Sequence, residues 1–67
     1  MRDIATIQLM DNQSQEECVA IIRVVGDSIG LCISLISDGD VEIFMRKDDC
    51  EQVIKALQQA VSSITAE

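Results

Sequence analysis

The stretch "SDGDVEIFMRKDDCEQVI", residues 37–54, decides the fold, because the spacing of its apolar residues changes from that of a strand to that of a helix. Val41, Ile43 and Met45 alternate with Glu42 and Phe44, which is typical of a strand. From residue 50 onward the apolar positions recur every three or four residues, as on one face of a helix: Cys50, Val53, Ile54, Leu57, Ala60, Val61 and Ile64. The sequence therefore predicts a strand at 41–46 followed directly by a helix.

The acidic residues after Lys47 suit the start of that helix. Asp48 is a favourable N-cap residue, and Glu51 stands three positions later, which completes a capping box. Asp49 adds negative charge to the first turn, where the helix dipole favours it. We expect the helix to run from about residue 48 to about residue 65.

Three further segments have the pattern of strands. Residues 3–10 alternate, residues 18–25 are apolar on both sides apart from Arg23, and residues 29–37 place most of their apolar side chains on one side. Turn residues separate them at Gly26 and at Asp38-Gly39-Asp40. Short connections favour antiparallel neighbours. The expected fold class is α+β: a four-stranded antiparallel meander (ββββα) with one C-terminal helix packed on one face.

The turns also predict a register. A two-residue turn at Gly26-Asp27 sets Ile22 opposite Leu31, and a three-residue loop at 38–40 sets Leu35 opposite Ile43. A two-residue turn at Asp38-Gly39 is the alternative, but it separates the apolar residues of the two strands. The helix, at about 1.5 Å per residue, is long enough to lie along the whole sheet.

Length and composition describe a single small domain, residues 1–67, with 48% hydrophobic residues. No run of about 20 apolar residues predicts a membrane span, and the first residues do not resemble a signal peptide. The three cysteines, Cys18, Cys32 and Cys50, form no CxxC pair, and there is no histidine. This pattern is typical of a cytoplasmic protein without disulfides or structural zinc. Because a core of this size is marginal, we expect a partner subunit to complete it.

The charge argues against nucleic acid as a direct ligand. The net charge is −7, and Phe44 is the only aromatic residue. Binding to nucleic acid needs a basic patch, and binding to single strands also needs aromatic stacking platforms.

The sheet face opposite the helix is predicted to be an interface. Few polar residues are expected there, although a solvated sheet face normally carries many. An exposed apolar patch of several hundred Å² usually marks a binding surface, and a homodimer needs only one self-complementary patch. The residues expected at this interface are Val19, Ile21, Arg23, Ile36 and Phe44. The alternative is that this face is no interface and that isolated apolar side chains are tolerated on it.

A second surface is acidic. A meander places the loop at 11–17 and the turn at 38–40 at the same end of the sheet, where the expected acidic edge consists of Asp11, Glu16, Glu17, Asp38 and Asp40. It is either a solubilising rim or a docking edge for a basic protein partner. The order D-G-D-x-E superficially resembles a calcium loop but lacks its length and flanking helices. We expect no metal site.

No catalytic set is apparent, so we expect neither an enzyme nor a cofactor. Cys32 near Arg23 is the only candidate nucleophile. The favoured hypothesis is a small, homodimeric protein-interaction module. The alternative is an acidic inhibitor or nucleic-acid mimic, of the type that mobile elements encode, that blocks a basic nucleic-acid-binding protein. A small-molecule binder that uses the dimer cleft is a third hypothesis, which no polar constellation favours.

Overall fold

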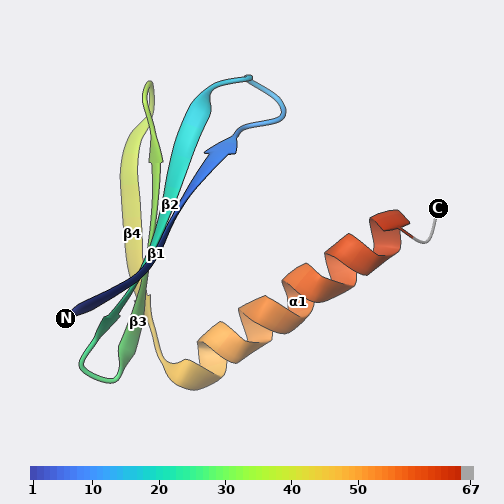
Figure 1. The fold of residues 1–67 in the computed structure, drawn as a ribbon. Helices are drawn as coiled ribbons and strands as arrows, with labels where there is room; N and C mark the ends of the chain where they lie inside the picture. The colour runs from blue at the N-terminus through green and yellow to red at the C-terminus, as the bar shows by residue number, and fades with distance from the viewer. Residues whose placement is uncertain (66–67) are drawn as a thin grey trace.

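Four strands and one helix make up the part of the protein that the computed structural model describes, residues 1–65. They are β1 (Arg2–Met10), β2 (Glu17–Val25), β3 (Ser28–Leu35), β4 (Gly39–Met45) and α1 (Lys47–Thr65). The strands form one antiparallel sheet in the order β1-β2-β3-β4 (Figure 1). This confirms the predicted α+β class, a four-stranded meander followed by one C-terminal helix.

The register between β2 and β3 is the one that the Gly26-Asp27 turn predicts. Ile22 lies opposite Leu31, and Ala20 lies opposite Ile33. Gly26 has a φ of 61°, in the left-handed region that glycine adopts without a steric penalty.

The register between β3 and β4 differs from the prediction. Leu35 pairs with Gly39 and Leu31 pairs with Ile43, so the turn spans residues 36–38 instead of 38–40. Gly39 has a φ of 80° and takes the left-handed conformation at the first position of β4, which allows the chain to turn two residues earlier. The shift preserves the alternation of side chains, so every strand residue keeps its predicted face. Ile36 and Ser37 leave the predicted strand because they now lie in the turn, and Arg46 lies beyond the end of β4.

The helix begins one residue earlier than predicted, and its cap is different. The first helical hydrogen bond runs from the amide of Cys50 to the carbonyl oxygen of Arg46, at 3.0 Å. Arg46 is therefore the N-cap residue, and the predicted capping box of Asp48 and Glu51 is wrong. Asp48 and Asp49 lie inside the first turn, and Arg46 Nε contacts Asp49 Oδ2 at 3.2 Å. The ion pair lies at the bend between β4 and α1, and both of its side chains are exposed.

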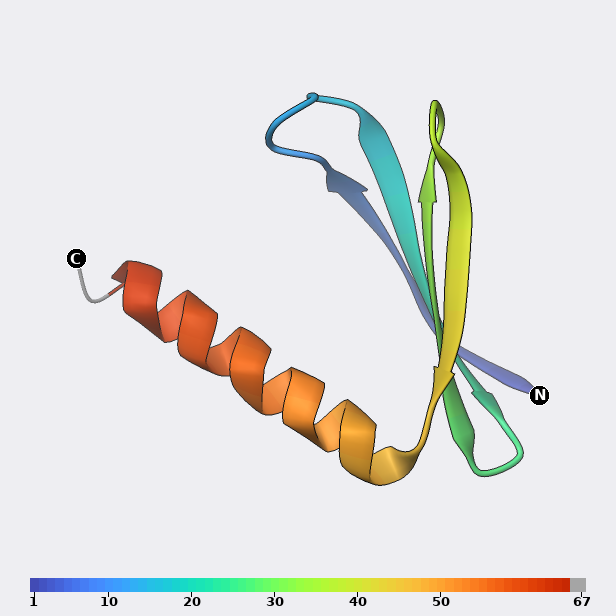
Figure 2. The ribbon, with the colours of Figure 1, turned by 180° about the vertical axis from the view of Figure 1, so that it is seen from behind.

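The helix touches the sheet only at one end. It leaves β4 through the single residue Arg46 and then diverges from the strands (Figures 1 and 2). Within the described residues, the backbone of α1 comes close only to β3 and β4. Its contact with the sheet is thus much shorter than its length allows.

The core is correspondingly small. Ala20, at 6% exposure, is the only hydrophobic side chain classed as buried among those described. The radius of gyration is 13.5 Å, whereas a compact chain of this length has about 11 Å. The single chain is thus an open structure with little interior.

Candidate functional site

The two faces of the sheet differ in chemistry. Because side chains alternate along a strand, the register assigns the paired strand residues to a face. Ile4 has no such assignment, because it lies at the irregularity of β1 between Asp3 and Ala5. The helix-side face is apolar apart from Arg2 at one corner, and consists of Ala5, Ile7, Leu9, Cys18, Ala20, Ile22, Val24, Ile29, Leu31, Ile33, Leu35, Val41, Ile43 and Met45. The helix-free face is mixed, and consists of Asp3, Thr6, Gln8, Met10, Glu17, Val19, Ile21, Arg23, Val25, Ser28, Gly30, Cys32, Ser34, Asp40, Glu42 and Phe44.

Between the helix-side face and α1 lies an open apolar cleft of about 220 Å³. Sheet residues of β2, β3 and β4 form one wall, and the first half of the helix stripe forms the other. The lining residues are Ile22, Ile29, Leu31, Met45, Cys50, Val53, Ile54 and Leu57. The stripe therefore faces the predicted side of the sheet, but the cleft between them is not filled.

Exposure increases along α1 as it moves away from the sheet. The exposed fraction is 40% for Val53, 61% for Leu57 and 73% for Ile64. On the sheet, the apolar side chains of the two outer strands are exposed as well, namely Ile7, Leu9, Val41 and Ile43. Together these side chains form a continuous apolar surface on both walls of the cleft, and an exposed apolar surface of this kind usually marks a binding site.

The helix-free face is held together by polar contacts across its strands. Arg23, on β2, lies 3.5 Å from Asp3 Oδ1 through its Nε and 3.3 Å from Glu42 Oε2 through its Nη1. Its guanidinium therefore connects β1 with β4. Ser34 Oγ donates a hydrogen bond to Asp40 Oδ1 at 2.5 Å. Burying these paired charges in an interface would still cost desolvation energy.

Four of the five predicted interface residues share this helix-free face. Val19, Ile21 and Arg23 are half-buried, and Phe44 is exposed. Phe44 lies opposite Gly30, and a Cβ on Gly30 would meet Phe44 Cε1 at 3.1 Å, so the ring rests over the glycine. Ile36 is separate from them, in the β3–β4 turn. The apolar part of this face is thus broken up by the Arg23 ion pairs.

The predicted acidic residues lie at the end of the sheet away from the start of α1. The β1–β2 loop and the β3–β4 turn both reach this end (Figure 1), and Ser37 Oγ donates to Glu16 Oε2 at 2.7 Å between them. Asp11 accepts hydrogen bonds from the hydroxyl and the amide of Ser14, which hold the pKa of the Asp11 carboxyl below its usual value. Three of the predicted acids therefore have local structural partners: Asp11, Glu16 and Asp40.

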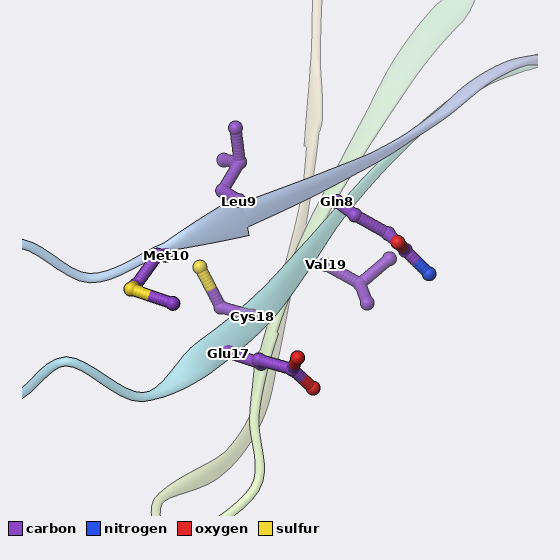
Figure 3. A pocket seen from close by; sticks show the side chains of 6 residues that line it. All are labelled: Gln8, Leu9, Met10, Glu17, Cys18 and Val19. Atoms are coloured by element: carbon purple, nitrogen blue, oxygen red, sulfur yellow. The ribbon is translucent and has the colours of Figure 1, made fainter.

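A shallow hollow of about 290 Å³ lies at the end of β1 and the start of β2 (Figure 3). Its lining residues are Gln8, Leu9, Met10, Glu17, Cys18 and Val19. Cys18 and Glu17 are consecutive on β2 and point in different directions, so the carboxylate does not approach the thiol. The hollow therefore lacks the paired nucleophile and base that covalent catalysis requires.

The candidate nucleophile Cys32 lies on the helix-free face. It pairs with Ile21, two residues before Arg23 on β2. The guanidinium of Arg23 is already paired with Asp3 and Glu42. Among residues 1–65, no group of three or more His, Cys, Asp or Glu side chains is arranged to hold a metal ion. In the same residues, no helix is long and apolar enough to cross a membrane.

Comparison of the chain with protein-family models, with curated proteins and with solved structures found no match.

Sequence reasoning missed the cleft as a site, because it assumed that the helix would cover its own sheet. One signal was available. Four strands spaced by about 4.8 Å make a face whose outer strands are about 14 Å apart, whereas a helix with its side chains is about 10 Å wide. One helix therefore leaves part of such a face bare, even when it lies flat on it.

Proposed function

We propose that the protein is a small interaction module that works by associating through the walls of its cleft, not by catalysing a reaction. The observation that carries this proposal is the continuous apolar surface formed by the helix-side face and the α1 stripe. Burial of apolar surface contributes roughly 25 cal/mol per Å². A surface of this kind left in water would disfavour the single chain and favour any complex that covers it.

The helix-free face is the weaker candidate for association. A dimer through Val19, Ile21, Arg23, Ile36 and Phe44 remains a prediction from the sequence. Against it stand the ion pairs of Arg23, whose burial would cost desolvation energy. The helix-side face carries no such penalty, because its only charged strand residue is Arg2, at a corner.

The test is the molar mass of the protein in solution, measured by light scattering at micromolar concentration and at two salt concentrations. Association through apolar walls predicts a mass above the 7.4 kDa of one chain. That mass should be unchanged at high salt, because screening weakens contacts between charges and not contacts between apolar groups. A monodisperse monomer that binds no apolar dye would contradict the proposal.

The acidic edge supports a second candidate function, an acidic inhibitor or mimic that docks on a basic protein. Five acids gather at one end of the sheet, and no lysine or arginine occurs between residues 24 and 45. Binding of this kind depends on charge and should weaken steeply as salt is added. A matched pair of variants tests it: Asp38→Asn removes charge at the acidic edge, and Asp27→Asn removes the same charge at the opposite end. Only the first should weaken binding to a basic protein.

A cytoplasmic location belongs to the same proposal. All three cysteines are free thiols, and none is fully buried. Free, partly accessible thiols persist in a reducing compartment. Export of the protein to an oxidising compartment should therefore produce cross-linked species, which non-reducing electrophoresis would detect.

A further inference from the structure

We infer that the occupant of the cleft is a second copy of this chain, and that the second half of α1 from each copy lies against the helix-side face of the other. This inference rests on the proposed function and adds the identity of the partner and the segment that it contributes. Four observations lead to it: the surplus of exposed surface, the compatible lengths of the two walls, the width of the sheet, and the short connection at Arg46.

The surplus surface has the size of a dimer interface. The chain exposes 5530 Å², whereas a compact monomer of its mass exposes about 4,200 Å². Covering the difference on two copies would bury about 2,700 Å² in total, which falls among the roughly 2,000–5,000 Å² of obligate homodimers.

Each copy also carries both halves of a complementary contact. The α1 stripe runs from Cys50 to Ile64, or about 21 Å of helix. A strand of eight residues such as β3 spans about 26 Å. The stripe of one copy therefore fits within the length of the partner's sheet, and both surfaces are apolar. A twofold axis makes both contacts at once, so no second kind of surface is needed.

The width of the sheet explains why the helix of one copy does not suffice. The backbone of α1 approaches β3 and β4 only, so Ile7 and Leu9 on β1 are beyond its reach. The first half of the stripe stays on its own sheet, where Cys50 and Val53 line the cleft. Leu57, at the outer edge of the cleft, is still 61% exposed, and the part of α1 beyond it, with Ile64 at 73%, is the part that would cover the partner.

The connection between β4 and α1 favours exchange of the helix between two copies over folding of the helix onto its own sheet. Only Arg46 separates the two elements. The hydrogen bond from the Cys50 amide to the Arg46 carbonyl oxygen fixes the first turn of the helix at this bend. A helix that folded back flat on its own sheet would need to distort this bend. Short connections of this kind favour the exchange of an element between copies.

Mixing two variants tests the exchange. Leu57→Asp damages the helix contact, and Ile7→Lys damages the sheet contact. Each variant alone should lose the dimer. In a 1:1 mixture, a dimer of the two variants has two different contacts. In one, the native helix of the Ile7→Lys chain meets the native sheet of the Leu57→Asp chain. In the other, the introduced Asp and Lys come together, and their charges have opposite signs. The mixture, refolded together from urea if either variant is unfolded alone, should recover about twice the mass of one chain by light scattering. The control mixture of Leu57→Lys with Ile7→Lys places like charges together and should recover clearly less dimer.

The outcomes separate the two proposals. If the wild-type protein is a dimer and the mixture of Leu57→Asp with Ile7→Lys recovers no dimer, the exchange is wrong, while association through apolar surface stands. If either variant remains a dimer alone, the contact that it was meant to damage is not in the interface, and the exchange is again wrong. If the wild-type protein is a monomer that binds no apolar dye, both proposals fail.

Discussion

The helix-side and helix-free faces belong to the same four strands, yet they differ in polar content and in how much of each face is covered. The helix-free face mixes apolar side chains with ion pairs and hydrogen bonds, so it is compatible with water. The helix-side face is almost purely apolar and is covered only near the start of α1. This difference is the basis of our proposal that a partner covers the helix-side face, because the backbone of α1 approaches only β3 and β4.

The largest expected effect concerns the helix stripe. Leu57 is 61% exposed in the single chain, so its truncation would cost little in a monomer. If a partner buries it, Leu57→Ala should lower the free energy of unfolding by about 2–5 kcal/mol. Urea denaturation at several protein concentrations measures this value and shows whether stability rises with concentration, as it does for an obligate dimer. Gln59→Ala, on the polar side of the helix, is the control and should change stability little.

A smaller effect is expected at Phe44 on the helix-free face. Its ring covers Gly30 on the neighbouring strand, a cross-strand contact worth up to about 1 kcal/mol. Phe44→Ala should lower the free energy of unfolding by about that amount and leave the mass in solution unchanged. A loss of the dimer on this substitution would mean that the two faces have been assigned the wrong roles.

The ion pairs of Arg23 should contribute less still. Its side chain is 31% exposed, and its two partners, Asp3 and Glu42, also reach solvent. Exposed pairs contribute about 0–1 kcal/mol and are screened by salt. Arg23→Gln should therefore cost under about 1 kcal/mol at low salt, and the cost should shrink at high salt. An effect of several kcal/mol that salt does not change would show that Arg23 is buried in an interface.

The smallest effect is expected at Asp48, in the first turn of α1. Because Arg46 caps the helix, Asp48→Ala removes only a favourable interaction with the helix dipole, worth about 0.3 kcal/mol at an exposed position. Asp49→Ala should cost more, since it also removes the contact with Arg46 Nε. If thermal unfolding shows that Asp48→Ala costs more than Asp49→Ala, the result would support the capping box predicted from the sequence.

The sequence was sufficient for the class, the order and the faces of the elements, because alternation and helical spacing are local properties. It predicted the β2–β3 register through Gly26, and it missed the β3–β4 register because Gly39 can begin a strand as well as end a turn. The helix start was misassigned for a similar reason: Asp48 has the chemistry of an N-cap residue, but the bend after Met45 makes Arg46 the cap.

The candidate site was harder to predict than the fold. The sequence showed that more apolar surface exists than one helix can cover, and it placed the excess on the helix-free face. What it did not contain was the direction of α1 after Arg46, which depends on one backbone bend. That direction leaves Leu57 and Ile64 exposed, together with apolar side chains of the helix-side face.

The most direct measurement compares two neighbouring residues of β4. Ile43 is 48% exposed on the helix-side face, and Phe44 is 57% exposed on the helix-free face. We would measure the mass of Ile43→Lys and Phe44→Lys by light scattering, with circular dichroism to confirm that each variant keeps its strands and helix. We predict that Ile43→Lys is a monomer and that Phe44→Lys is a dimer like the wild type. A monomeric Phe44→Lys beside a dimeric Ile43→Lys would contradict this assignment and place the interface on the helix-free face.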